Sequence, residues 1–178
     1  MNTTSIATAD VQFVSFYIGD SLYGLDIRLV KEVNTNTDIT RIPLSKPHIR
    51  GLVNIRGQIV LVIDSSVLFS GQPHTTSADS NLVILKTAAD IDQMAIEDPA
   101  DKQKLPDKPV ALLVDRIGNV ITVPKTIIEK TPQHMNAERA RFIKCVVKTD
   151  SFFLIVLDPL QIIAGTTIQT EQTDSQTI

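Results

Sequence analysis

The sequence predicts an all-β protein built from two related β-barrels of about five strands each, packed side by side, with short helical turns and a C-terminal helix. Ile, Val and Thr supply 56 of the 178 residues (22, 16 and 18). Such β-branched side chains pack well on pleated surfaces but lose rotamer freedom in helices. Short apolar runs separated by turn residues recur along the chain. Part of the first half also repeats in the second half, which indicates two related units.

Composition and charge exclude several classes of function. The net charge of −3 leaves no basic excess for a phosphate backbone, so we expect no nucleic-acid partner. The longest apolar run, Phe152–Leu157, has six residues, whereas a membrane-spanning helix needs about twenty. Residues 1–10 have no basic segment and no apolar stretch of the length that a secretory signal requires, and the one cysteine, Cys145, cannot form an internal disulfide. We therefore expect a cytoplasmic protein without membrane insertion.

The first elements are a predicted hairpin. Residues 11–18 alternate with both faces largely apolar, which is typical of a strand buried on both sides. After a turn at residues 19–21, residues 22–25 return as the second strand.

A short helical turn is predicted next. Asp26 can cap residues 27–33, where Val30 and Val33 follow Ile27 at spacings of three, on one side. Residues 38–42 form an extended piece, which the following prolines close.

Residues 49–69 predict a second hairpin followed by a helical turn. Two apolar runs flank Arg56-Gly57, and the glycine is available for the positive φ of a tight turn. Asp64 can cap a helical turn over residues 65–69, and a loop follows over residues 70–80.

The remaining sequence predicts further strands and one insertion. Residues 87–109 contain three prolines and little apolar periodicity, so we expect an exposed insertion joining two strands. Residues 1–10 and 165–178 are polar and are predicted to be mobile tails around a folded domain over residues 11–164. The other strands are expected at residues 82–85, 110–114, 120–123, 142–148 and 152–157, with a closing helix at 159–164.

The internal repeat predicts the architecture. Residues 49–69 align without a gap on residues 143–163, at an offset of 94, and the order strand, turn, strand, capping Asp, helical turn agrees. A second echo, between residues 23–33 and 112–120, needs a gap of two residues. Two barrels packed together leave a groove, which is a natural site for a partner. The identical pairs are Ile49 and Ile143, Val53 and Val147, Val62 and Val156, and Asp64 and Asp158.

Two motifs carry a family resemblance. Asn54-Ile55-Arg56-Gly57 and the D-I-x-x-V-x-E-V pattern at residues 26–33 resemble the CheW family of bacterial chemotaxis adaptors, and the similarity extends over residues 11–164. The resemblance implies two SH3-like five-stranded barrels. It also implies a cytoplasmic adaptor in membrane-associated arrays, with the regulatory domain of a CheA-type histidine kinase and the cytoplasmic tips of chemoreceptors as partners. No cofactor or metal is implied.

The resemblance also implies a partner-binding surface. Its candidate residues are Val30, Glu32, Val33, Arg56, Gly57, Leu82 and Val83. Arg56 is the sharpest candidate, because a guanidinium at a hairpin tip can donate several hydrogen bonds. The plainer interpretations are that Arg56 is a solvated turn residue, that Gly57 serves only its turn, and that Val30 and Val33 belong to the core.

Several positions depart from the family pattern. Leu61, Ser65-Ser66, Cys145 and Ser151 stand where the family commonly has Pro, Leu-Arg, Gly and Gly. The long insertion and the missing basic residue at Ser66 suggest a paralogue from a chemosensory system other than the flagellar one, for example a type IV pilus array.

A search for catalytic or metal-binding motifs identifies none. The histidines lie far apart in segments predicted as loops, and no phosphate-binding or metal-binding motif occurs. Cys145 lies in an apolar strand, where a thiol is usually packing, and the aspartates after strands are better explained as helix caps. We therefore predict a non-catalytic adaptor. The alternatives are a β-barrel module that binds a small ligand or peptide in the inter-barrel groove, and an enzyme with an unrecognised site.

Overall fold

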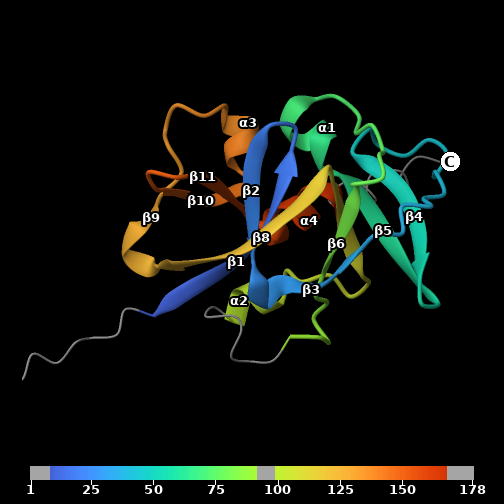
Figure 1. The fold of residues 1–178 in the computed structure, drawn as a ribbon. Helices are drawn as coiled ribbons and strands as arrows, with labels where there is room; N and C mark the ends of the chain where they lie inside the picture. The colour runs from blue at the N-terminus through green and yellow to red at the C-terminus, as the bar shows by residue number, and fades with distance from the viewer. Residues whose placement is uncertain (1–8, 92–98, 168–178) are drawn as a thin grey trace, which may run out of the picture.

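The computed structural model describes residues 9–91 and 99–167 (Figure 1). Within them the strands form a six-stranded sheet, ordered β8-β1-β2-β11-β10-β9, and a five-stranded sheet, ordered β3-β6-β7-β5-β4. The predicted all-β fold of two barrel-like units is therefore confirmed. The strands are β1 Asp10–Ile18, β2 Ser21–Asp26, β3 Val30–Asn34, β4 Ile49–Ile55, β5 Gln58–Asp64, β6 Asn81–Leu85, β7 Val110–Val114, β8 Arg116–Pro124, β9 Ile128–Glu129, β10 Ile143–Lys148 and β11 Phe153–Leu157.

Short helices connect and close the sheets. None of the helices in the described ranges is both long and apolar enough to cross a membrane. The α-helices are α1 Ser65–Ser70, α2 Pro99–Lys102, α3 Ala137–Ala140 and α4 Pro159–Thr167, and the 3₁₀ helices are η1 Ile27–Leu29 and η3 Lys125–Ile127.

The internal repeat of the sequence corresponds to two hairpins whose strands pair in the same register. Val53 pairs with Val60 between β4 and β5, and Val147 pairs with Leu154, at the same offset of 94, between β10 and β11. Both hairpins have a bulge after their first pair. The capping aspartates correspond as well, because Asp64 accepts hydrogen bonds from the backbone N–H groups at the start of α1, and Asp158 does the same for α4. The repeat is therefore structural.

The two units exchange strands. β3 follows β2 in the chain but pairs with β6 of the other sheet, and β8 follows β7 but pairs with β1. Figure 1 shows β8, in yellow, crossing the molecule. Because each sheet contains strands from both halves of the chain, neither half can complete its own sheet. The two units are intertwined.

The largest core cluster combines side chains of both sheets. Phe16 of β1 and Leu112 of β7 belong to it, and both are fully buried. Phe69 of α1 lies with its ring centroid 5.0 Å from that of Tyr23 and 6.2 Å from that of Phe142. One aromatic ring from the five-stranded unit thus packs between two rings of the six-stranded unit, where it joins them by apolar burial.

The predicted helical turn over residues 27–33 is wrong in its second half. The 3₁₀ helix ends at Leu29, and Val30 begins β3. Residues three apart point to opposite faces of a strand, so Val30 is buried whereas Val33 is 39% exposed. Pairing of the β-branched residues with β6 outweighs the helical spacing, which covers less than two turns.

Other predicted boundaries also need correction. β1 begins at Asp10, and α4 continues to Thr167, beyond the predicted domain end at residue 164. Of the extended piece at residues 38–42, only Thr40 is paired, in a bridge with Leu52. The insertion is not uniformly exposed, because Ile91 and Leu105 are buried. The rest of the predicted tails, residues 1–8 and 168–178, and the insertion residues 92–98 lie outside the described residues.

Candidate functional site

The Arg56 hairpin is held by its own sequence. Ile55 pairs with Gln58, which leaves Arg56-Gly57 as a two-residue turn with φ values of 50° and 85°. Two positive φ angles are what a type I′ turn requires. Asn54 Oδ1 accepts a hydrogen bond from the Gly57 N–H at 2.8 Å. Arg56 therefore stands at a fixed tip, and its side chain is 78% exposed.

An ion pair joins this tip to the far edge of the same sheet. Arg56 Nη1 lies 2.8 Å from Glu32 Oε2 of β3, although β3 and β4 stand at opposite ends of the strand order. The sheet therefore curls until its edges meet. Glu32 is also the acceptor for Asn34 Nδ2, at 3.3 Å. Exposed ion pairs stabilise a fold by about 1 kcal/mol or less, so this pair mainly orients Arg56.

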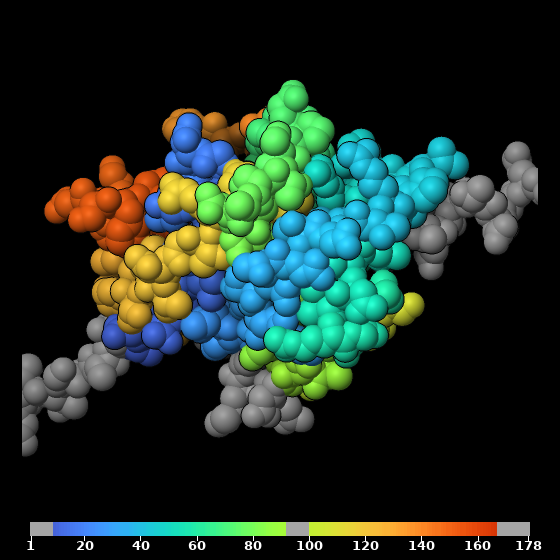
Figure 2. Space-filling model, turned by 45° about the vertical axis from the view of Figure 1, so that its right-hand side comes forward, coloured from blue at the N-terminus to red at the C-terminus, as the bar shows by residue number. Residues whose placement is uncertain are grey.

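A groove of about 180 Å³ lies beside the ion pair. Its floor is apolar and its rim carries charges of both signs. Figure 2 shows this region, with the hairpin in turquoise beside β3 in blue. The lining residues are Lys31, Glu32, Ile55, Arg56, Gln58, Val60, Ile84 and Pro109. All of them belong to the five-stranded sheet or to its connections, so this groove differs from the one predicted between the barrels.

The structure brings some of the predicted partner residues together and buries others. Glu32, Arg56 and Gly57 meet at the hairpin, and Val33 is partly exposed on the same strand as Glu32. Val30 is buried, and Leu82 and Val83 are fully buried in β6, which lies between β3 and β7. The last two side chains cannot contact a partner in this conformation, and they support the surface from within.

The serines that depart from the family pattern belong to the fold. Ser65 and Ser66 are buried at the start of α1. Ser65 Oγ donates a hydrogen bond to the Leu113 carbonyl, and the Ser66 N–H donates to Asp64. Position 66 therefore contributes almost no surface in this structure.

Sequence reasoning missed six of the eight groove residues, among them Lys31, Gln58 and Pro109. Lys31 is held by an ion pair, with its Nζ 3.0 Å from Asp90 Oδ1. Asp90 and Pro109 both belong to the insertion, which had no apolar periodicity to indicate where it packs. No signal in the sequence could have paired Lys31 with Asp90.

Acid is expected to weaken the fold in part through Asp90. The Thr87 N–H, the Lys31 ammonium and the Thr87 hydroxyl all donate to the carboxylate, and they lower the pKa of Asp90 from 3.8 to about 2. A carboxyl with a depressed folded-state pKa stabilises the fold above its unfolded pKa and loses that contribution as the pH falls through its folded pKa. In urea titrations, we expect the stability difference between wild type and Asp90→Asn to shrink between pH 5 and pH 2.5. An equal difference at both pH values would contradict this assignment.

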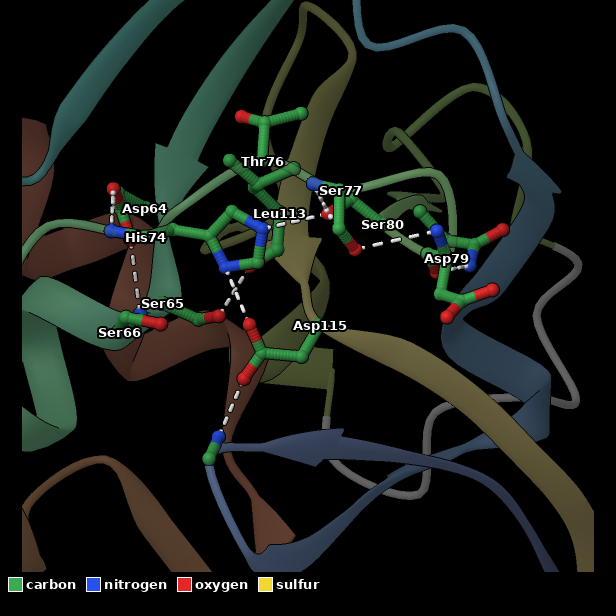
Figure 3. A network of polar contacts seen from close by, with 12 residues as sticks. Asp64, Ser65, Ser66, His74, Thr76, Ser77, Asp79, Ser80, Leu113 and Asp115 are labelled. Atoms are coloured by element: carbon green, nitrogen blue, oxygen red, sulfur yellow. Dashed lines mark hydrogen bonds and ion pairs between the residues drawn. The ribbon is translucent and has the colours of Figure 1, made fainter.

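A serine and a histidine of one loop meet an aspartate from a distant part of the sequence near α1 (Figure 3). His74 Nε2 lies 2.8 Å from Ser80 Oγ, and His74 Nδ1 lies 2.7 Å from Asp115 Oδ1. Nucleophile, base and orienting carboxylate follow one another in this way in acyl-transfer triads. The arrangement therefore bears on the alternative that the chain is an enzyme.

Burial assigns this network a structural role. Ser80 is 1% exposed and His74 is 4% exposed, so a substrate cannot reach the hydroxyl in this conformation. Ser80 Oγ also accepts a hydrogen bond from the Ser77 N–H at 2.8 Å. Asp115 accepts from the Gly19 N–H in the β1–β2 turn. The network thus ties the loop before β6 to the other sheet.

Other reactive groups give no sign of chemistry. Within residues 9–91 and 99–167, no three His, Cys, Asp or Glu side chains come together in a way that could hold a metal ion. Burial raises the pKa of the half-buried Cys145 thiol. The nearby Lys144 ammonium lowers this pKa, whereas the Asp26 carboxylate raises it. The reactive thiolate is therefore disfavoured.

Comparisons with known proteins agree on one family. The family model described as a CheW-like domain matches residues 12–166. The chemotaxis protein CheW of Treponema pallidum is 31% identical over 159 residues, which cover 86% of this chain and 83% of that protein. CheW of Thermotoga maritima is 24% identical, over 95% of this chain and 98% of that protein. The crystal structure of the scaffolding protein TtCheW from Thermoanaerobacter tengcongensis superposes with a TM-score of 0.67 at 28% identity, over 84% of this chain and 90% of that one.

Proposed function

The chain belongs to the CheW-like domain family, and from this premise we propose that it is a non-catalytic chemotaxis adaptor. In this proposal it couples transmembrane chemoreceptors to a CheA-type histidine kinase. It contacts the regulatory domain of the kinase and the cytoplasmic tips of the receptors, and it resides in the cytoplasm at receptor arrays.

The observation that carries the proposal is the fixed, exposed Arg56 tip beside a groove. The Asn54 hydrogen bond and the Glu32 ion pair orient Arg56 before any partner arrives. A preorganised side chain loses little freedom on binding, and arginine is enriched among the residues that dominate protein interfaces. The proposed contact surface consists of Glu32, Val33, Arg56 and Gly57 with the groove residues.

The repeat supports an adaptor with two different partners. Residue 150 is the counterpart of residue 56 at the offset of 94, and it is Asp150 at an exposed hairpin tip of the other unit. The two equivalent tips thus carry opposite charges. Electrostatic complementarity selects partners by sign, so one chain can present two distinct binding faces.

The test is reconstitution of the coupling. The kinase is incubated with receptor-containing membrane vesicles, with or without the purified chain, and the sedimented kinase is measured. We expect the chain to increase the sedimented kinase in proportion to its concentration until saturation. Equal amounts with and without the chain, using folded components, would contradict coupling.

The alternative function is a module that binds a small ligand or peptide in the inter-barrel groove. Calorimetry against metabolites and short peptides separates it from the adaptor, because the adaptor is expected to give heat only with protein partners.

A further inference from the structure

We propose that Asp90, in the stem of the insertion, is a positioning residue that sets the affinity of the groove for its partner by holding Lys31 in place. The stem consists of residues 87–91 and 104–109. This inference rests on the proposed function of the groove. It assigns the insertion a role in partner binding.

The stem is anchored to the domain at both ends. Ile91 and Leu105 are buried together with Leu160 of α4, and Leu29 and Ala88 pack against them. The Ala88 N–H donates to the Pro106 carbonyl at 3.1 Å, which joins the two sides of the stem. The stem is therefore packed against the domain next to Leu29, the residue directly before β3.

The carboxylate of Asp90 is fixed independently of Lys31. Asp90 Oδ2 accepts hydrogen bonds from the Thr87 N–H at 2.9 Å and from Thr87 Oγ1 at 2.8 Å. The Asp90 N–H donates in turn to the Thr87 carbonyl at 3.0 Å. Lys31 Nζ lies 3.0 and 3.2 Å from the two carboxylate oxygens. The lysine thus meets a preformed acceptor.

Lys31 and Pro109 bring the stem to the groove. Lys31 precedes Glu32 in β3, and both line the groove with Pro109, the last residue before β7. An unrestrained lysine samples many rotamers, and ordering it on binding costs affinity. Because Asp90 orders Lys31 in the free protein, the partner meets a groove rim that is already arranged.

The experiment compares Asp90→Asn with wild type. Affinities are measured by calorimetry against the purified regulatory domain of each CheA-type kinase of the organism and against receptor signalling fragments. For the probe whose affinity depends on Arg56, we expect Asp90→Asn to bind about two- to tenfold more weakly. Asp101→Asn is the matched control, because it removes the Asp101–Lys104 ion pair of the same insertion at 2.8 Å, away from the groove. Its affinity is expected to equal that of wild type.

A Lys31→Met background separates positioning from a general structural role. If Asp90 acts through Lys31, Lys31→Met alone weakens binding, and adding Asp90→Asn has no further effect on affinity. Wild-type affinity for Asp90→Asn, or an equal loss in both backgrounds, would overturn the inference while leaving the proposed function intact. If wild type bound none of these probes, the proposed function would fall, and the inference with it.

Discussion

Replacing Arg56 by Glu is expected to weaken partner binding by about a hundredfold or more, the range of a central arginine in an interface. The substitution removes the guanidinium donors and places a second carboxylate beside Glu32, which lies 2.8 Å from Arg56 Nη1 in the wild type. A partner that presents acceptors to Arg56 then meets two negative charges. Calorimetry against the kinase regulatory domain and the receptor fragment measures the loss.

The fold is expected to tolerate this change. The Arg56 side chain is 78% exposed, and loss of an exposed ion pair usually costs about 1 kcal/mol or less. Lys148→Glu is the matched control, since Lys148 is exposed in the β10–β11 hairpin of the other unit, at the position equivalent to Asn54. A large drop in the unfolding temperature of Arg56→Glu, or an equal loss of affinity for the same partner with Lys148→Glu, would contradict the assigned role.

Gly51→Ala is expected to have the largest effect on stability. Gly51 has a φ of 146°, and an added Cβ would lie 2.1 Å from the Thr40 carbonyl oxygen. That carbonyl accepts the Leu52 N–H at 2.8 Å, in the bridge that joins residues 38–42 to β4. Relieving the clash breaks this bridge. Backbone strain and overpacking each cost about 1–3 kcal/mol, so we expect a total loss of about 3 kcal/mol or more.

Gly71→Ala is the control that measures the cost of a positive φ without a steric clash. Gly71 also has a positive φ, 74°, but its Cβ would have nothing within 4 Å. A left-handed conformation at alanine costs roughly 1–2 kcal/mol. Urea unfolding of both variants measures the difference, and a loss for Gly51→Ala no larger than that for Gly71→Ala would contradict the close approach to Thr40.

The repeat and its turns could be predicted because their causes are local. The two-residue turn at Arg56-Gly57 follows from glycine and from the Asn54 acceptor, and Asp64 and Asp158 cap helices directly after them in sequence. Because residues 143–163 align on residues 49–69 at the offset of 94, the same pairing was expected in the second hairpin. Short apolar runs bounded by turn residues located most of the other strands.

The exchange of strands could not be predicted, because its causes are distant in sequence. Val30–Asn34 pairs with β6, about fifty residues later, and the helical spacing of Val30 and Val33 carries no trace of that partner. The contacts of the insertion are also non-local, since Ile91 and Leu105 meet Leu160. The Ser80–His74–Asp115 network likewise joins segments that show no shared motif.

The candidate site was also predicted only in part. The resemblance placed Glu32, Arg56 and Gly57 at the surface, where the structure also has them. It could not separate exposed from buried positions on the strands, so Val30, Leu82 and Val83 entered the predicted site although they are core.

The proposed coupling requires this chain to bind a histidine kinase directly. The most direct measurement titrates the purified chain, shown to be folded by thermal unfolding, with the isolated regulatory domain of each CheA-type kinase of the same organism. We expect saturable binding at one site per chain with at least one kinase. A folded chain that binds none of these kinases would contradict the proposed coupling.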